Sequence, residues 1–354
     1  MNASRASIII LNWNGWRDTA ECLESVYRID YPNYDVIVVD NGSRDDSIKR
    51  IKEYCLGEVK VESKFFECEA SNKPLKVFEI SQDEAGSFNP QLYERCRVNK
   101  KVILIKNKKN YGFAGGNNIG IKFALNFLKP EYILLLNNDT VVSENLLKEL
   151  VKTAENDRKI GIVGPKIYFY DYKGRSDVIS FTGEDLIPWK GTGQRYGSGE
   201  MDDGRWDKPM ELDRIEGSCM LIRKDVFERV GFFDEIYFCY YEETDFCIRA
   251  KRVGFKIKYC PTARIWHKVA ASTGGRESPK RIYFLTRNRI IFIRKNFPNH
   301  LWKHFLYIIF YEIWHRLGVS LLYRRDPKAL WYYLTGLIDG YKALIKRKIV
   351  KGWL

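Results

Sequence analysis

Short apolar runs alternate with amphipathic stretches along the first 155 residues of the chain. The apolar runs are rich in Ile, Val and Leu and cover residues 7–11, 34–39, 101–105 and 132–136. Apolar residues at helical spacing follow over 17–29, 117–127 and 143–154. Strands that alternate with helices predict an α/β fold, with a mostly parallel sheet flanked by helices on both faces. Such sheets bind ligands at the carboxyl ends of their strands, where polar clusters follow these runs.

Later segments depart from this alternation. Residues 57–99 are polar and separate the second predicted strand from the third, so we interpret them as an insertion with a small hairpin over 59–80. Residues 171–210 are rich in Gly, Asp and Trp, which is typical of a lid or binding loop over a cleft. Beyond them we expect a helix over 219–230, a helical stretch within 237–253, and short strands over 255–259 and 263–265.

The tail, residues 296–354, is expected to form two amphipathic helices separated by residues 324–327. In the first helix, the polar positions are His300, His304, Tyr307, Tyr311 and His315, opposite Leu301, Trp302, Phe305, Leu306, Ile309, Phe310, Ile313 and Trp314. In the second, they are Lys328, Thr335, Asp339, Lys342 and Lys346, opposite Leu330, Leu334, Leu337, Ile338, Tyr341, Leu344 and Ile345. Either helix fits core packing with one solvated face, or binding to a membrane surface.

Charge divides the chain into a nearly neutral body and a basic tail. The chain carries 59 Lys and Arg against 45 Asp and Glu, a formal net charge of +14. Residues 280–354 hold 16 of the basic residues and 3 of the acidic ones, and therefore nearly all of the excess. Such asymmetry indicates an anionic partner, a membrane surface or a nucleic acid. Aromatic amphipathic helices without a recognised nucleic-acid module favour the membrane, so we expect no nucleic-acid partner.

The composition excludes several classes of protein. A chain with 45% hydrophobic and 29% charged residues is typical of a globular protein and not of a disordered one. Its apolar runs are far shorter than the roughly 18 residues that a membrane-spanning helix needs. The first seven residues carry no apolar segment, so we expect no secretory signal, and we expect the eight cysteines to be reduced structural thiols.

Two polar clusters are candidates for nucleotide binding. Residues 40–43 (Asp-Asn-Gly-Ser) follow the second strand, where a carboxylate can hold a nucleobase edge or a ribose hydroxyl. An Asn-Gly turn that caps the next helix is the alternative. Residues 110–118 are rich in glycine, which lets backbone N–H groups approach a diphosphate at a helix N-terminus. This second pattern is neither G-x-G-x-x-G nor a P-loop, so alone it is weak.

Four acids and one histidine are candidates for metal binding and catalysis. Asp139 follows the fourth strand, a place suited to Mg²⁺ or Mn²⁺, which bind one or two carboxylates. Glu242, Glu243 and Asp245 repel one another, which raises a pKa and favours a general base. His267 is the only histidine in the first 299 residues and is a candidate for metal or phosphate binding. The alternatives are a turn-capping Asp, a solvated helix start and a structural His.

Together these motifs resemble family 2 of the inverting glycosyltransferases, and in particular its rhamnosyltransferase-like branch, which builds cell-surface polysaccharides. The resemblance covers residues 6 to about 295. It rests on eight motifs in the family's order, at residues 8–15, 38–43, 110–118, 134–140, 217–223, 231–235, 241–245 and 266–267. It implies the Rossmann-like GT-A fold and a nucleotide-sugar donor linked to UDP, dTDP or GDP.

The resemblance also assigns residues to sites. The residues implied for the nucleotide and donor are Asn12, Asn14, Asp40, Asn41, Gly115, Gly116, Asn117 and Asn138. Asp139 matches the second acid of the family's metal-binding D-x-D motif, and His267 matches a histidine that completes the metal site. Glu243 matches the family's catalytic base.

Two residues depart from the family's pattern. Asn137 stands where many relatives carry the first Asp of D-x-D, which removes one anionic ligand. Glu243 stands where an Asp is usual, and its extra methylene moves the carboxylate, so Glu242 or Asp245 could share its role. The insertion over 57–99 also lies outside the pattern.

The implied reaction is an inverting, metal-dependent transfer of a hexose or deoxyhexose to a hydroxyl of a glycan or lipid-linked acceptor. One base takes the proton, and Mg²⁺ or Mn²⁺ neutralises the leaving nucleoside diphosphate. We expect a glycosyltransferase domain over 1–295 and a tail over 296–354 that binds an anionic membrane surface at its cytoplasmic face. The alternative is a catalytically inactive nucleotide-sugar or glycan-binding module on the same scaffold, which the departures at Asn137 and Glu243 would suit.

Overall fold

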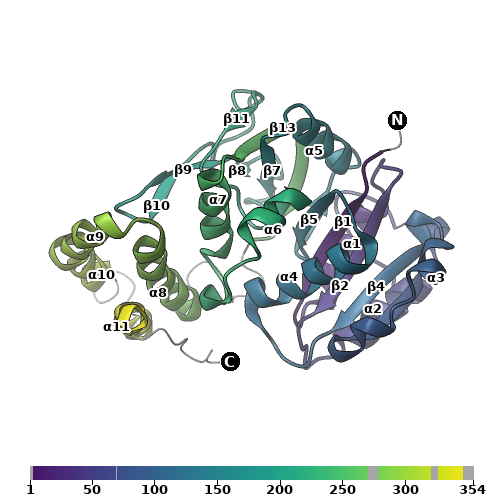
Figure 1. The fold of residues 1–354 in the computed structure, drawn as a ribbon, viewed down its shortest axis with the longest axis horizontal. Helices are drawn as coiled ribbons and strands as arrows, with labels where there is room; N and C mark the ends of the chain where they lie inside the picture. The colour runs from purple at the N-terminus through teal and green to yellow at the C-terminus, as the bar shows by residue number, and fades with distance from the viewer. Residues whose placement is uncertain (1–2, 69, 270–277, 320–325, 346–354) are drawn as a thin grey trace.

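The computed structural model describes residues 3–68, 70–269, 278–319 and 326–345 (Figure 1). Its main element is an 11-stranded sheet. Nine of the strands lie in the order β11-β13-β7-β12-β5-β1-β2-β4-β3, and two more strands complete it, β6 paired with β13 and β8 paired with β7. The strands are β1 (Ala6–Asn12), β2 (Tyr34–Asp40), β3 (Lys76–Ser81), β4 (Lys101–Lys106), β5 (Tyr132–Asn137), β6 (Thr140–Val142), β7 (Ile160–Phe169), β8 (Ile179–Phe181), β11 (Met210–Glu211), β12 (Cys219–Arg223) and β13 (Lys256–His267).

The sheet is parallel in its first half and mixed in its second. Strands β1 to β4 pair only in parallel with their neighbours, and β5 is parallel to β1. β12 is antiparallel to both β5 and β7, whereas β7 and β13 are again parallel. The predicted α/β fold with a mostly parallel sheet is confirmed.

Helices cover both faces of this sheet, as the alternation predicted (Figure 1). Successive residues of a strand point to opposite faces. Ile8 and Ile10 of β1 therefore share one buried cluster with α1, α2 and α5, whereas Ile9 shares the other with α4, α6 and α7. The helices are α1 (Trp16–Val26), α2 (Ser47–Leu56), α3 (Pro90–Glu94), α4 (Gly112–Phe123), α5 (Leu146–Glu155), α6 (Lys224–Val230), α7 (Glu242–Arg252), α8 (Pro279–Asn296), α9 (Leu301–Tyr307), α10 (Ile313–Leu317) and α11 (Pro327–Ile345).

Several predicted elements are wrong in detail. The insertion over 57–99 contributes β3 and α3 rather than a hairpin, because residues 76–81 pair in parallel with the edge of β4. The helix expected over 219–230 begins only at residue 224, because 219–223 is a strand held between β5 and β7. The two short strands expected near residue 260 form the single strand β13, with an irregular register between Cys260 and Arg264. The 18-residue α8 was not predicted.

The segment over 171–210 is more structured than a loop. Its strand β8 is fully buried and pairs with β7, and β9 (Glu184–Ile187) and β10 (Thr192–Arg195) form a separate two-stranded hairpin. The hairpin lies between the sheet and α9 (Figure 1). The role of this segment as a lid stays a prediction.

The helix α11 packs along α8, which lies on the body side of the predicted boundary at residue 296. Tyr283 of α8 donates a hydrogen bond of 2.9 Å to Asp339 of α11. A Cβ at Gly336 would lie 2.9 Å from the carbonyl oxygen of Tyr283, and one at Gly340 would lie 2.8 Å from Ile290. These two glycines let the helices approach closely, so α11 is fixed to the body. The expectations for residues 320–325 and 346–354 lie outside the described residues.

The other tail helix region, residues 301–317, buries two polar side chains and exposes most of its predicted apolar face. His304 and Glu312 are buried, where His304 Nδ1 lies 3.1 Å from the carbonyl oxygen of Trp189 and Arg289 lies 2.6 Å from Glu312. The exposed side chains include Trp302, Phe305, Leu306, Ile309, Phe310, Tyr311 and Trp314. Core packing by the apolar face is therefore the wrong interpretation for this segment. Within the described ranges, every helix is too short or too polar to span a bilayer.

Candidate active site

Asp139 and His267 meet at one edge of the sheet because β6 pairs with β13. This pairing places Thr140 opposite His267, and Asp139 directly precedes Thr140. Oδ1 of Asp139 lies 3.2 Å from Nε2 of His267, and the two side chains are only 8% and 6% exposed. The structure thus brings together the two residues that the sequence assigned to a metal site.

A second carboxylate, that of Glu216, approaches the other ring nitrogen of His267. Its Oε1 lies 3.6 Å from Nδ1, and neither ring nitrogen makes a hydrogen bond within the described chain. Burial lowers the pKa of His267, but the charges of Asp139 and Glu216 outweigh it and raise that pKa to about 10. Burial also opposes ionisation of both acids, yet His267 keeps the pKa of Asp139 below its ordinary value and that of Glu216 at about 2. The two carboxylates therefore favour the protonated form of the ring that lies between them.

This cluster fits a cation that takes most of its ligands from the substrate. Among the described residues, no group of three His, Cys, Asp or Glu side chains is arranged to hold a metal ion. Mg²⁺ and Mn²⁺ do not require one, because they bind through one or two carboxylates plus substrate phosphates and water. Asp139 supplies such a carboxylate, and the buried Nε2 of His267 has no other partner.

The backbone before α7 has an unusual conformation that positions the acidic start of this helix. Three non-glycine residues have positive φ angles: Phe238 (63°), Tyr240 (67°) and Tyr241 (77°). Each such residue costs on the order of 1 kcal/mol or more, and such strain clusters at functional sites. Asn288 of α8 holds the segment by donating from Nδ2 to the carbonyls of residues 237, 239 and 240, at 2.8, 2.8 and 2.9 Å.

Glu243 lies beside the loop that carries Glu216. A Cβ built on Gly217 would be 3.6 Å from Cβ of Glu243. Arg214 lies 3.2 Å from Oε1 of Glu243 and donates a 2.8 Å hydrogen bond to the hydroxyl of Thr244. The structure therefore places the candidate base one loop away from the candidate metal ligands.

Glu242 differs from Glu243 in its environment. Its side chain is buried, and its Oε2 has no hydrogen-bond partner in the described residues. Burial, reinforced by the charge of Glu243, raises the pKa of Glu242 well above its ordinary value. A carboxyl that retains its proton is a poor proton acceptor, so this geometry favours Glu243 as the base.

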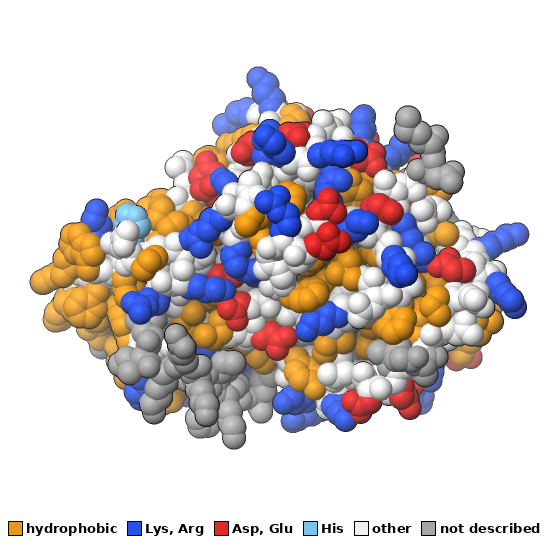
Figure 2. Space-filling model, in the orientation of Figure 1, with side chains coloured by type: hydrophobic (Ala, Val, Ile, Leu, Met, Phe, Trp, Pro, Cys, Tyr) orange, Lys and Arg blue, Asp and Glu red, His pale blue; other side chains and the backbone are white. Residues whose placement is uncertain are grey.

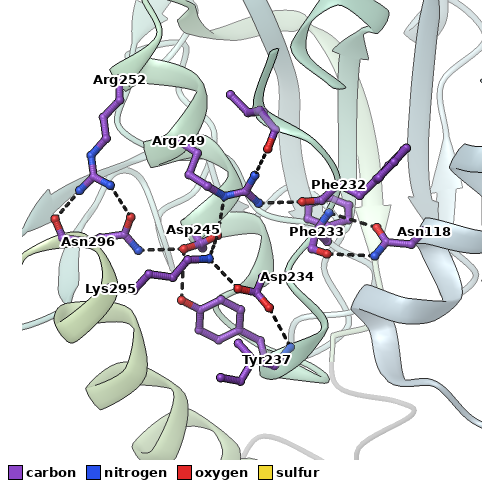
Figure 3. A network of polar contacts seen from close by, with 12 residues as sticks. Asn118, Phe232, Phe233, Asp234, Tyr237, Asp245, Arg249, Arg252, Lys295 and Asn296 are labelled. Carbon is purple, nitrogen blue, oxygen red and sulfur yellow. Dashed lines mark hydrogen bonds and ion pairs between the residues drawn. The ribbon is translucent and has the colours of Figure 1, made fainter. Parts of the chain in front are cut away.

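Asp245 is enclosed by partners on every side (Figure 3). Its carboxylate accepts hydrogen bonds from Arg249, Lys295, Asn296 and Tyr237, at 2.7, 3.0, 2.8 and 3.2 Å. Burial raises the pKa of Asp245, but the cations Arg249 and Lys295 more than offset it, and the pKa lies below its ordinary value. This closed network ties α7 to α8 and favours a structural role for Asp245.

A chain of side-chain hydrogen bonds crosses the carboxyl ends of β5, β1 and β2. Asn138 donates to Thr19 at 3.1 Å, Thr19 donates to Asn12 at 2.8 Å, and Asn12 donates to Asp40 at 2.8 Å. Asp40 also accepts from Ser43 and is only 1% exposed. Three of the expected donor-site residues are thus one network, but the Asp40 carboxylate is engaged within it.

Of the remaining donor-site candidates, Asn14 lies beside the loop after β2 and the others lie around the start of α4. Asn14 is exposed and its backbone N–H donates to Ser43 at 2.9 Å. Asn41 is buried and holds the loop over 107–112 through hydrogen bonds to its side chains and backbone. A Cβ at Gly116 would lie 2.5 Å from Leu11, so this glycine serves close packing of the helix on the sheet. Gly115 lies beside Tyr111, and Asn117 bonds the carbonyl of Phe113 within the helix.

Comparison with known proteins identifies the family. The family model described as "Glycosyltransferase like family 2" matches residues 4–287. The chain belongs to this family. The low-salt glycan biosynthesis hexosyltransferase Agl10 of Haloferax volcanii is 31% identical over 206 residues, which cover 58% of this chain and 64% of that protein. The dTDP-rhamnosyl transferase RfbF of Shigella flexneri is 26% identical, over 63% of this chain and 73% of that protein.

Solved structures support the fold. The mannosyltransferase PcManGT of Pyrobaculum calidifontis, in complex with GDP-Man and Mn²⁺, has a TM-score of 0.54 at 14% identity and covers 98% of this chain and 88% of its own. S. aureus TarS 1-349 in complex with UDP-GlcNAc has a TM-score of 0.53 at 14% identity, over 96% of this chain and 81% of its own. The predicted GT-A fold is confirmed.

Three site residues of this family 2 member were missed in the sequence. Glu216 directly precedes a motif of the family, but its approach to His267 depends on strand pairing that no local pattern shows. Arg214 contacts Glu243 and Glu184 from 29 and 30 positions away. Asn288 belongs to α8, which the hydrophobic pattern did not reveal.

Proposed function

We propose that the chain is an inverting glycosyltransferase that moves a hexose or deoxyhexose from a UDP-, dTDP- or GDP-linked donor to a hydroxyl of a glycan or lipid-linked acceptor. The observation that carries the proposal is that Asp139 and His267 meet at one edge of the sheet, with Glu243 of α7 beside the loop whose Glu216 approaches His267. Family membership and relatives named as hexosyl and rhamnosyl transferases support it. The pathway proposed is synthesis of a cell-surface polysaccharide or a glycoprotein glycan.

Asp139 and His267 are proposed to hold Mg²⁺ or Mn²⁺. When bound, the ion supplies positive charge against the departing nucleoside diphosphate. An imidazole nitrogen is a softer ligand than a carboxylate oxygen, so this pair favours Mn²⁺ over Mg²⁺. The fold neighbours PcManGT and GalNAc-T7 were crystallised with Mn²⁺.

Glu243 is proposed to take the proton from the acceptor hydroxyl, which then attacks the anomeric carbon in line. Arg214 fixes the orientation of its carboxylate through the 3.2 Å contact. With one base and no nucleophile proposed, the reaction inverts the anomeric configuration. Product NMR that shows retention would contradict this mechanism.

Glu243→Gln with Glu242→Gln as its matched control tests this assignment and the inactive-module alternative. A general base contributes typically 10²–10⁴-fold to the rate. We expect Glu243→Gln to lose about that much in sugar transfer, and Glu242→Gln to stay within a few-fold of wild type. Unchanged transfer in Glu243→Gln would refute Glu243 as the base. No transfer by the wild-type chain with any donor would favour the inactive binding module.

The exposed aromatic surface of residues 302–314 is proposed to dock on an anionic membrane at its cytoplasmic face. Figure 2 shows hydrophobic side chains gathered at this end of the molecule, over α9 and α10. Trp302, Phe310 and Trp314 are 59%, 74% and 67% exposed. Amphipathic helices with aromatic residues on one face and nearby basic charge lie in the interface of anionic membranes. Such a position would bring the site to a lipid-linked acceptor.

Vesicle flotation tests the membrane proposal. The wild-type chain should float with vesicles of anionic lipid, less so at high salt because exposed charges are screened. Trp302→Ser, Phe310→Ser and Trp314→Ser together should abolish flotation. Leu56→Ser, Leu92→Ser and Met201→Ser are the matched control, because these exposed side chains lie on the body. Equal flotation of both triple variants would refute the proposal.

A further inference from the structure

We infer that Glu216 is the positioning residue of the metal site and acts through His267. In this inference, which rests on the proposed metal-dependent function, Glu216 faces Nδ1 of His267 at 3.6 Å and accepts its N–H once a cation beside Asp139 occupies the Nε2 lone pair. Glu216 is therefore not itself a ligand.

The geometry separates the two carboxylates. Asp139 lies 3.2 Å from Nε2, whereas Glu216 lies 3.6 Å from Nδ1. The two ring nitrogens point in different directions, so a cation shared by Asp139 and Nε2 has Glu216 on the far side of the ring. Both nitrogens are buried without a hydrogen bond in the described chain, so nothing else there competes for them.

The chemistry of imidazole gives Glu216 its role. A neutral histidine carries one N–H donor and one acceptor nitrogen, and the partner of the first decides which nitrogen can bind a metal. Metal-ligating histidines almost always donate their other N–H to a carboxylate, a carbonyl or water. An ionised carboxylate only accepts, so Glu216 favours the tautomer with its proton on Nδ1.

Glu216 also supplies a carboxylate to the cluster, which lacks one at residue 137 because Asn stands there in place of Asp. The cluster still contains two carboxylates, although residue 137 is an amide, because Glu216 brings the second one from another loop. This loop is fixed to the D-x-D segment, since Asn137 donates its backbone N–H to the carbonyl of Ser218 at 2.9 Å. Arg195 lies 4.0 Å from Glu216 on its other side and restrains the carboxylate.

Calorimetric titration of the full chain with Mn²⁺ tests the inference. Loss of an outer partner typically costs 10–100-fold in metal affinity. We expect Glu216→Ala to weaken Mn²⁺ binding by about that factor, and Glu216→Gln by clearly less, because its amide oxygen can still accept from Nδ1. Glu211→Ala removes an exposed acid that pairs with Lys258 and should leave affinity unchanged.

A double-mutant comparison separates positioning from direct ligation. In a His267→Ala background, Glu216→Ala should cause no further loss of Mn²⁺ affinity, because the residue through which it acts is gone. An additional loss there, or unchanged affinity in the single variant, would overturn the inference. If Glu216→Ala does not fold, the titration is made with Glu216→Gln instead, and ¹⁵N NMR of the four histidines reports which ring nitrogen of His267 carries the proton. An Nδ1-protonated His267 in the loaded chain supports the inference, and the other tautomer refutes it.

Failure of this inference is distinguishable from failure of the proposed function. Wild-type chain that binds no Mn²⁺ would overturn the inference and the metal assignment together. Sugar transfer in the presence of EDTA would then show whether the transferase proposal itself survives.

Discussion

Two buried clusters of charge in this protein differ in how completely they are satisfied. Around Asp245, four donors from α7, α8 and the preceding segment occupy the carboxylate. Around His267, two carboxylates lie within 3.6 Å, yet neither ring nitrogen makes a hydrogen bond in the described residues. A closed network contributes to stability, whereas the open cluster leaves polar atoms that can bind a ligand. The comparison therefore distinguishes an acid whose hydrogen bonds are satisfied within the chain from the acids of the proposed metal site.

Two buried histidines show the same contrast. His267, between two carboxylates, has a pKa raised to about 10, and His304, buried beside Arg289, has a pKa lowered to about 3. The two carboxylates beside His267 together outweigh the effect of burial and favour the charged ring, whereas burial and then the charge of Arg289 both favour the neutral ring of His304. The sign of the neighbouring charge therefore distinguishes the two buried histidines.

The largest effect on stability is expected from Asp245→Ala. Removing one partner of a buried ion pair costs about 3–5 kcal/mol, because Arg249 and Lys295 lose their counter-charge in the interior. Urea unfolding should show this loss in the free energy of unfolding. Glu242→Gln, which removes the charge of an unsatisfied acid without truncating it, should stay within about 1 kcal/mol. Equal losses in the two variants would erase the distinction between the clusters.

A smaller, pH-dependent effect is expected from His304. Its folded pKa of about 3 lies below its unfolded value of roughly 6.5, so protonation favours the unfolded chain. The neutral ring therefore contributes its full share to the free energy of unfolding above about pH 6.5. This contribution falls as the pH falls below that value, by about 2 kcal/mol at pH 5.

Unfolding measured at pH 7 and pH 5 checks this, with His304→Gln as the non-titrating reference. Arg289, Glu312 and Tyr307 face the same region and remain in both proteins. The variant should lose less stability between these pH values than the wild-type chain. Parallel pH profiles would show that His304 does not titrate as its surroundings imply.

The smallest effect is expected on the exposed aromatic surface. Surface substitutions usually change stability by at most about 0.5 kcal/mol. Trp314→Ser should therefore leave the free energy of unfolding nearly unchanged, whereas Ile308→Ala, on the buried side, should cost about 2–5 kcal/mol. A loss above about 1.5 kcal/mol in Trp314→Ser would mean that this face packs against the protein.

The fold could be largely predicted from the alternation of short apolar runs and helical spacing, because a parallel sheet buries whole strands. The pattern could not distinguish the strand β12 from a helix, since its four consecutive apolar residues suit both, and only pairing with β5 and β7 makes it a strand. It also could not orient residues 301–317, because an amphipathic helix looks the same whichever face is covered.

The candidate site was predicted only where it is local in sequence. Asp139 follows the end of β5, Glu243 lies in the first turn of α7 and His267 is the last residue of β13, so short motifs identify them. The separation of Glu242, Glu243 and Asp245 into three environments depends on Arg214, Lys295 and other residues distant in the chain. Glu216 approaches His267 only because of strand pairing.

Binding of nucleoside diphosphates tests the central claim most directly, since it needs no knowledge of the acceptor. UDP, dTDP and GDP would each be titrated into the wild-type chain and Asp139→Ala, with Mn²⁺ and with EDTA. At least one nucleotide should bind in Mn²⁺, and its affinity should fall about 10-fold or more in EDTA and in Asp139→Ala. Nucleotide affinity that is the same in EDTA and in Asp139→Ala as in the wild-type chain with Mn²⁺ would contradict a metal-assisted donor site at Asp139 and His267. Absence of binding by all three nucleotides would contradict it as well.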